Sequence, residues 1–288
     1  MPDTLPGGQP WPRVGIVTPS FNQGQFIEET IRSVLLQGYP DLEYIIVDGG
    51  STDGSVDIIR KYEPWLAYWV SEPDRGQSQA INMGFRRSKG DILAWLNSDD
   101  LLEPLAVCMA AAYLTVHPEV GMVYGDRTIV DSTGNRISYR LSPSFYRWQL
   151  RYRSGIAQES AFFRRDLFYA VGELDESLHY SMDYDLWWRF IRRTRIHHLP
   201  VLMGGYRAHE ASKSIMVARP NNTAEYVGRL RSEVLRVRRK YMGRDCNSFE
   251  RKILPLVWKG MEYLERLSGY KHRKWARAHR LRERAMGG

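Results

Sequence analysis

The stretch ILAWLNSDDLLEP, residues 92–104, joins an apolar run to a cluster of polar and acidic side chains. The run Ile92–Leu96 has the length and composition of a buried strand. The polar residues 97–100 follow it directly, and adjacent carboxylates repel each other unless a cation or a helix end takes up their charge. Two interpretations stay open here: a metal site, or a capping role for Asp100 at a helix that begins near Glu103.

Strand-like and helix-like segments alternate four times in the first 120 residues. This alternation is typical of a mostly parallel, Rossmann-like α/β sheet with helices on both faces. Such sheets bind ligands at the carboxyl ends of their strands, where this chain places polar or acidic residues. The expected strands are 14–18, 44–48, 66–70 and 92–96, and the expected helices are 26–37, 55–62, 77–87 and 103–116.

The pattern changes after residue 120. We expect strand structure at 121–130 followed by a turn at 131–135, a helix at 183–193, and a strand at 196–203 that Pro200 interrupts. From about Asn222 onward the sequence looks helical. The predicted organisation is a flexible N-terminus at 1–12, a nucleotide-binding α/β domain at 13–218 and a helical, basic C-terminal extension at 219–288.

Composition favours an ordinary folded protein of the cytoplasm. The 288 residues are 43% hydrophobic, which suffices for a buried core and argues against a disordered chain. Cys108 and Cys246 lie too far apart for a cysteine metal motif and do not suggest a disulfide scaffold. No signal peptide and no apolar run of membrane-spanning length is visible.

The net charge of +8 is concentrated at the C-terminus. The segment from Gly243 to Gly288 holds 12 Lys and Arg against 5 Asp and Glu. A basic helix of this kind favours an anionic membrane surface, so we expect a cytoplasmic protein that can lie peripherally on the inner face of the membrane. A solvated basic helix is the alternative. No recognised motif supports binding to nucleic acid.

Several motifs together resemble the inverting glycosyltransferases of family 2, which have the GT-A fold. They are VTPSFNQGQFIEETIRSVLLQ (17–37), IIVDGGSTDGS (45–55), SEPDRGQSQAINMGFRRSKGDILAWLNSDD (71–100), SMDYDLWWR (181–189) and YRAHEASKS (206–214). The resemblance covers about residues 13–215. It implies transfer of a sugar from a nucleotide-diphosphate sugar to a hydroxyl of a glycan or a lipid-linked acceptor, with Mn²⁺ or Mg²⁺ as cofactor.

The resemblance assigns the acidic cluster to the donor and its cation. Asp99 stands where the family coordinates the metal, and Asn97 and Ser98 stand near the ribose. The family has Asp where this chain has Asn97. Because an amide carries no charge, we expect a weaker hold on the cation than an Asp pair would give.

Further motif positions imply nucleotide contacts. They are Thr18, Pro19 and Asn22 in the first loop, Asp48 for the base or ribose, and Asp74 with Arg75 before a helix start suited to a diphosphate. Many relatives have a second Asp where this chain has Gly49. From the residues alone, Pro19 can simply end a strand and Asp48 can simply form a turn.

The motifs after residue 150 imply the catalytic and acceptor groups. Asp183 stands at the place of the catalytic base, although Met182 replaces the acidic residue that usually precedes it. The alternative is that Asp183 caps a helix in which Asp185 pairs with Arg189. By resemblance His209 is a metal ligand, and Gln158 and Glu159 lie near the acceptor. We expect Trp187 and Trp188 to belong to the hydrophobic core.

Two rival functions remain at this point. A nucleotidyltransferase on a similar sheet would usually carry a Gly-rich loop with a Lys after the first strand. The segment TPSFNQGQF, which follows the first strand here, contains no Lys. A catalytically silent nucleotide-binding or scaffold protein is the other rival, which Asn97 and Met182 leave open.

Overall fold

The computed structural model describes residues 4–5, 8–142, 147–151, 154–210, 212, 224–245, 247, 249–250, 252–254, 256–257 and 260. Most of the basic C-terminal segment that favours a membrane surface lies outside the described residues. At the N-terminus, Leu5 and Trp11 are buried in the core, and Trp11 packs edge-on against Tyr39. Among the described helices, none is long and apolar enough to cross a membrane.

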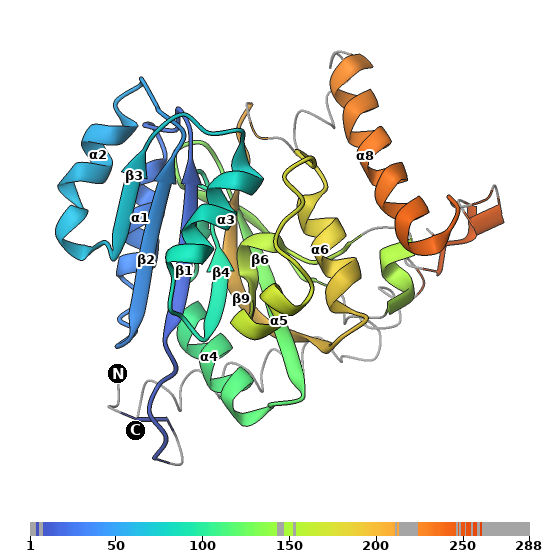
Figure 1. Ribbon diagram of the computed structural model, residues 1–288, viewed down its shortest axis with the longest axis horizontal. Helices are drawn as coiled ribbons and strands as arrows, with labels where there is room; N and C mark the ends of the chain where they lie inside the picture. Colours follow the sequence, from blue (N-terminus) through green and yellow to red (C-terminus); the bar gives the residue numbers. More distant parts are fainter. Residues whose placement is uncertain are drawn as a thin grey trace.

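The first half of the chain alternates strands and helices as the sequence predicts (Figure 1). The helix predicted at 77–87 has the same bounds in the structure, and the other boundaries move by a few residues. The elements are β1 Val14–Ser20, α1 Ile27–Leu35, β2 Leu42–Asp48, α2 Ser55–Lys61, η1 Glu63–Trp65, β3 Tyr68–Ser71, α3 Gln77–Arg87 and β4 Ile92–Trp95.

The second half adds the remaining strands of the sheet and further helices on both of its faces. The elements are β5 Leu101–Leu102, α4 Ala106–Val116, β6 Val120–Val130, β7 Arg136–Arg140, η2 Arg147–Arg151, η3 Gln158–Ser160, β8 Ala161–Arg164, α5 Arg165–Ala170, α6 Met182–Phe190, β9 Arg195–Arg207 and α8 Ala224–Met242.

One sheet of nine strands runs through the molecule in the order β3-β2-β1-β4-β8-β6-β9-β5, with β7 paired to β6. β3, β2, β1 and β4 are parallel neighbours, and β6 and β9 also pair in parallel. β8 joins the two groups by antiparallel pairing with β4 and β6. The predicted α/β sheet with helices on both faces is confirmed.

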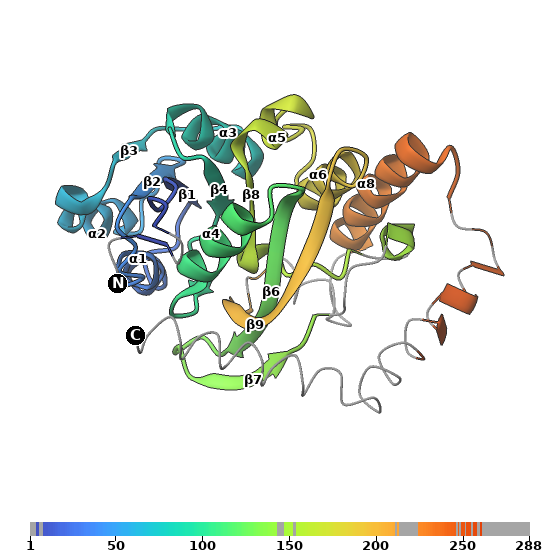
Figure 2. The same ribbon diagram turned by 90° about the horizontal axis from the view of Figure 1, so that it is seen from below.

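Side chains that alternate along the strands pack in two hydrophobic cores, one on each face of the sheet. Leu93 and Trp95 of β4 belong to the cluster with α3, α5 and α6, whereas Ile92 and Ala94 belong to the cluster with α1 and α4. This two-residue period is the pattern of a strand buried on both faces. Figure 2 shows α1 and α4 on one side of the sheet and α3, α5 and α6 on the other.

One alternative left open by the sequence and one expectation are wrong. Asp100 does not cap a helix, because Leu101–Leu102 forms β5 and the next helix begins only at Ala106. Pro200 does not interrupt its strand, because β9 runs through it as one strand. The β6–β9 register shifts between Tyr124 and Asp126 at this point, so the missing Pro N–H falls where regular pairing is suspended.

The helix α8 of the C-terminal extension packs on α6. Val237 is 1% exposed and belongs to the same core cluster as Trp187, and Tyr241 stacks on Trp188 with ring centroids 5.8 Å apart. The predicted Asp185–Arg189 pair forms at 2.8 Å. The carboxylate of Asp185 also accepts hydrogen bonds from Lys240 and Tyr241 of α8, so one buried acid links the two helices.

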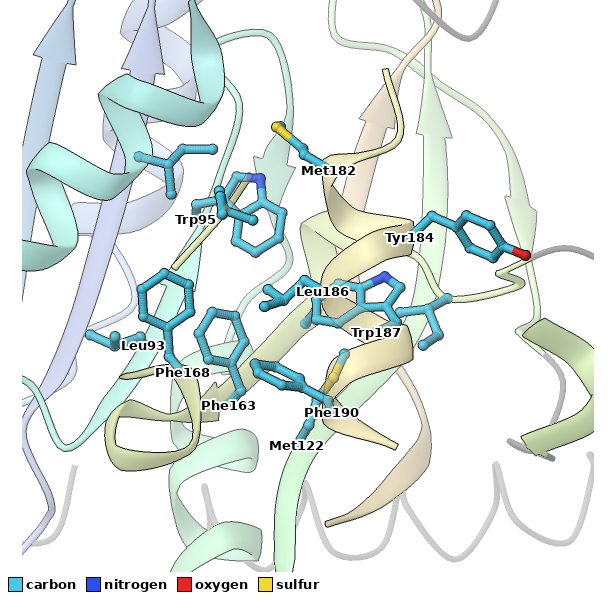
Figure 3. Packing of buried hydrophobic residues seen from close by; sticks show 14 of the residues in the cluster. Leu93, Trp95, Met122, Phe163, Phe168, Met182, Tyr184, Leu186, Trp187 and Phe190 are labelled. Atoms are coloured by element: carbon cyan, nitrogen blue, oxygen red, sulfur yellow. The ribbon is translucent and has the colours of Figure 1, made fainter. Parts of the chain in front are cut away.

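Trp187 shows how the core holds α6 against the sheet. Its side chain is fully buried and stacks on Trp95 of β4, with ring centroids 5.8 Å apart (Figure 3). Replacing Trp187 with Ala leaves a large cavity, so we expect a loss of about 3–5 kcal/mol in the free energy of unfolding. Urea unfolding followed by circular dichroism measures this loss. Val116→Ala, at an exposed residue of α4, is the control and should change stability little.

Candidate functional site

A cavity of about 470 Å³ lies at the carboxyl ends of β1 and β4, beside the first turn of α3. This is the edge where parallel α/β sheets bind ligands. Five residues predicted from the sequence are brought together here: Pro19, Asp74, Asn97, Ser98 and Asp99. The rest of the lining is Ser20, Phe21, Gln23, Gly49, Gly76, Gln77, Ala80, Asp100, Tyr206 and Ser212.

Asn97 is held in place by two glutamine side chains. Gln77 Nε2 donates to Asn97 Oδ1, and Asn97 Nδ2 points toward Gln158 Oε1 at 3.4 Å and Asp100 Oδ2 at 3.2 Å. Gln158 in turn donates to the carbonyl of Trp95 at 2.8 Å. The predicted acceptor residue Gln158 therefore supports the strand end that carries Asn97.

Arg207 holds the 97–100 loop in place through hydrogen bonds to Asp99 and Asp100. It is 1% exposed, and its guanidinium donates to the carbonyl of Asp99 at 2.9 Å and pairs with Glu29. Its backbone N–H donates to Asp100 Oδ1 at 3.0 Å. The end of β9 thus fixes both acidic residues, and Asp100 serves as a structural acceptor where the sequence suggested a cap.

Asp99 faces the cavity and contacts His209. His209 Nε2 lies 2.9 Å from Asp99 Oδ2, and the His209 ring packs against Phe26 with centroids 4.5 Å apart. A carboxylate and an imidazole are ligands that Mn²⁺ accepts. Among the described residues, no group of three or more His, Cys, Asp or Glu side chains is placed to hold a metal ion. Asp99 and His209 could supply two of the ligands that a cation at this position would take.

The electrostatics of the acidic pair also fit a cation. Burial raises the pKa of Asp100 well above its ordinary value, and the neighbouring charges of Asp99 and Glu159 raise it further. Asp100 thus stands where a negative charge is costly. A cation held by Asp99 would relieve that cost.

Asp48 is fully buried and shapes the loop after β2. Its carboxylate accepts hydrogen bonds from the backbone N–H groups of Gly50 and Ser51 and from the hydroxyls of Ser51 and Ser71, at 2.6–3.1 Å. Four donors saturate most of its acceptor capacity. The turn expected from the residues alone is present, and Gly49 rather than Asp48 reaches the cavity.

The first loop is tied to the same turn. Asn22 adopts a left-handed backbone with φ of 50°, which Asn tolerates, and its side chain accepts the N–H of Thr52 at 2.9 Å. Thr18 is buried, and its hydroxyl lies 3.0 Å from the Tyr44 hydroxyl. Thr18 and Asn22 therefore fix the loop from which Pro19 reaches the cavity.

Asp74 and Arg75 point in different directions. Asp74 lines the cavity and accepts the N–H of Gly76, whose φ of 119° requires glycine. Gly49 stands where many relatives have a second Asp. A Cβ at this position would lie 3.1 Å from Asp74 Oδ2, so the glycine leaves room for the Asp74 side chain. Arg75 pairs with Glu176 at 2.6 Å and its side chain is 75% exposed.

Glu159 lies in the interior. It is 4% exposed and pairs with Arg127 at 3.1 Å. Arg127 in turn lies over the ring of Tyr206, 5.3 Å from its centroid, and Tyr206 lines the cavity. Glu159 is thus linked to the cavity indirectly, because its partner Arg127 packs on the cavity residue Tyr206.

Asp183 occupies the first turn of α6, two residues after the N-cap Ser181, and is half-buried. It is not the capping residue. The start of α6 lies against the first turn of α3, where Ser78 Oγ donates to the carbonyl of Leu178 at 2.9 Å and contacts the sulfur of Met182. Because Gly76 and Gln77 line the cavity, this contact places the start of α6 beside the cavity rim. The apolar Met182 is explained by its place in the core.

Among the residues of the site that the sequence did not single out are Gln77, Tyr206 and Arg207. Signals for all three were present in the motifs. Gln77 opens the helix whose start was expected to face the nucleotide, and Tyr206 and Arg207 directly precede the Ala–His pair of the last motif. Nothing in the local pattern says that Arg207 is buried, since that depends on Glu29 and the 97–100 loop.

Comparisons with solved structures agree with this architecture. S. aureus TarS in complex with UDP-GlcNAc is similar over 80% of this chain and 73% of its own, with a TM-score of 0.59 and 17% identity. The mannosyltransferase PcManGT from Pyrobaculum calidifontis in complex with GDP-Man and Mn²⁺ is similar over 96% of this chain and 76% of its own, with a TM-score of 0.58 and 20% identity. The predicted GT-A fold is confirmed.

Sequence comparison adds the family. A glycosyltransferase of Rickettsia typhi is 28% identical over 214 residues, which cover 69% of this chain and 65% of the relative. The chain thus matches just under two thirds of that relative's length. The model of the family described as Glycosyl transferase family 2 matches residues 15–172. Since that match covers more than half of the chain, the protein belongs to glycosyltransferase family 2.

Proposed function

We propose that the protein is an inverting glycosyltransferase that moves a sugar from a nucleotide-diphosphate sugar to a hydroxyl of a glycan or a lipid-linked acceptor. One observation carries the proposal. The cavity at the strand ends is faced by Asp99, which contacts His209, while Pro19, Asp74, Asn97 and Ser98 line it. The cavity thus offers carboxylate side chains to a cation, and its volume is suited to a nucleotide.

The donor class is supported by two solved structures of similar fold. TarS is in complex with UDP-GlcNAc, and PcManGT is in complex with GDP-Man and Mn²⁺. In this chain Asp99 and His209 would hold the Mn²⁺ or Mg²⁺ ion. When bound, the cation neutralises negative charge on the leaving diphosphate. Asn97 and Gln77 form a hydrogen-bonded pair at the cavity wall, where amide groups suit ribose hydroxyls.

The nucleotide site divides into residues that face the ligand and residues that hold its loops. Asp74, Ser98 and Pro19 line the cavity and would contact the nucleotide directly. Thr18, Asn22 and Asp48 are engaged within the protein and would position those loops. The exposed Arg75 lies one residue from Asp74, where its cation can attract the anionic donor.

Asp183 would act as the general base. An acceptor hydroxyl must lose its proton as its oxygen attacks the anomeric carbon, and an ionised carboxylate can accept that proton. Inversion requires the base on the face of the sugar opposite the leaving diphosphate. Asp183 lies on α6 and Asp99 follows β4, so the proposed base and the proposed metal ligand come from different elements.

The acceptor is proposed to approach from the side of α6 and the 158–159 turn. Gln158 and Glu159 would act there mainly through Asn97 and Arg127. The basic C-terminal segment would bring the enzyme to an anionic membrane surface, where a lipid-linked acceptor resides.

Turnover of donors tests this proposal. We expect the protein with Mn²⁺ to release nucleoside diphosphate from at least one member of a panel of UDP-, GDP- and dTDP-sugars, with water as a slow acceptor. Proton NMR during the reaction should show the product with its anomeric configuration inverted, before mutarotation. Retention of configuration would contradict inversion. Tight nucleotide binding without any turnover would favour a catalytically silent nucleotide-binding protein.

A further inference from the structure

Glu233 of α8 holds the segment that leads into α6. Its carboxylate accepts the backbone N–H groups of His179, Tyr180 and Ser181 at 3.0, 2.9 and 3.1 Å, and the Ser181 hydroxyl at 3.2 Å. Hydrogen bonds to an ionised acceptor are among the strong ones in proteins. A single side chain from the C-terminal extension therefore supplies four contacts to the three residues just before Met182 and Asp183.

Other contacts from α8 reach the same region. Arg236 donates to the carbonyl of Ser177 at 3.0 Å and to its hydroxyl at 3.1 Å. On the other side of Asp183, the carboxylate of Asp185 accepts bonds from Lys240 and Tyr241 at 2.9 and 2.8 Å. Contacts from α8 thus lie on both sides of Asp183 in the sequence.

The segment held by Glu233 also borders the donor cavity. His179 Nδ1 would lie 3.5 Å from a Cβ at Gly76, and Leu178 accepts the hydroxyl of Ser78. Gly76 is part of the cavity lining. A shift of the 178–181 segment would therefore move Asp183 relative to the cavity.

We propose that Glu233 is a positioning residue for catalysis, which sets the place of Asp183 relative to the donor. The inference rests on the proposed function of Asp183 as the base. Under it, α8 is part of the catalytic apparatus, although the family match ends at residue 172. General-base catalysis needs the carboxylate within hydrogen-bonding distance of the acceptor hydroxyl, and a misplacement of about 1 Å can cost ~100-fold in rate.

Glu233→Gln is the sharpest test, because it keeps the shape of the side chain. One carboxylate oxygen becomes an NH₂ group that cannot accept, so at least one N–H loses its partner and the others lose a charged acceptor. We expect the rate of nucleoside-diphosphate release from the donor that the wild type turns over to fall about 10- to 100-fold. The calorimetric Kd for the nucleoside diphosphate should stay within about twofold, because the cavity lining is untouched.

Two further variants sharpen the result. Glu233→Asp keeps the charge on a shorter side chain, so its rate should lie between those of the wild type and Glu233→Gln. Glu250→Gln is the matched control, because Glu250 is a carboxylate of the same C-terminal region that pairs with Arg244 at 2.6 Å instead of with α6. It should keep the wild-type rate.

Three outcomes would overturn the inference. Glu233→Gln can turn over like the wild type, it can lose donor binding together with activity, or it can fail to fold. The last two would make Glu233 a residue of general stability. A wild type that binds no nucleotide would overturn the proposed function first, and this inference with it, so the two failures are told apart.

Discussion

Replacing Asp183 with Asn is expected to lower the rate of sugar transfer by about 10²- to 10⁴-fold, the usual contribution of a general base. The amide has nearly the same shape as the carboxylate but cannot accept the proton of the acceptor hydroxyl. The helix should survive, because Asp183 is not its capping residue and α6 is held by its buried face. Nucleoside-diphosphate release, measured with the donor that the wild type turns over, reports the loss.

The control for this substitution is Asp57→Asn. Asp57 also lies in the first turn of a helix, α2, but its side chain is 78% exposed and pairs with Arg60 of the same helix. It should keep the wild-type rate, and both variants should bind nucleoside diphosphate with the wild-type Kd. If Asp183→Asn retained full activity, Asp183 would not be the base.

The second large effect is expected for Asp99→Asn. The variant removes one negative charge from the cavity, while the amide oxygen can still accept a hydrogen bond from His209. We expect nucleoside-diphosphate affinity in the presence of Mn²⁺ to fall by about 100-fold, toward the affinity measured in EDTA. Isothermal titration calorimetry with and without Mn²⁺ measures the difference directly.

A nucleoside without phosphates provides the reference for Asp99→Asn. Its binding should be equal in the wild type and the variant, because the base and ribose contacts remain. If Asp99→Asn kept the full Mn²⁺-dependent gain in affinity, the cation would be held elsewhere. The proposed roles of Asp99 and His209 would then be wrong.

Much of the fold follows from local patterns in the sequence. The helix at 77–87 is predicted with its observed bounds from its helical sequence pattern, and in the structure Gly76, with a positive φ, directly precedes it. Strand β4 and its polar end are visible for a similar reason, since an apolar run stops abruptly at Asn97. Trp187 and Trp188 are core residues, as their place in an apolar helix suggested.

The features that were missed depend on partners distant in the sequence. The helix predicted from 103 begins at Ala106 because Leu101–Leu102 pairs with Gly204 and Gly205 of β9. Pairing with β6 on both sides of Pro200 keeps β9 a single strand. Within the site, the burial of Arg207 depends on Glu29, and one of the four hydrogen bonds to Asp48 comes from Ser71 of the next strand. Local periodicity contains no signal for such contacts.

The most direct test of the account is calorimetric titration of the wild-type protein with UDP, GDP, dTDP and CMP, each in Mn²⁺ and in EDTA. The central claim is that the cavity at the ends of β1 and β4 is a nucleoside-diphosphate site in which Asp99 holds the cation. The predicted result is tight binding of one diphosphate in Mn²⁺, weakened strongly by EDTA. Binding that EDTA leaves unchanged would contradict the role of Asp99, and absence of binding for all four nucleotides would contradict the nucleotide site itself.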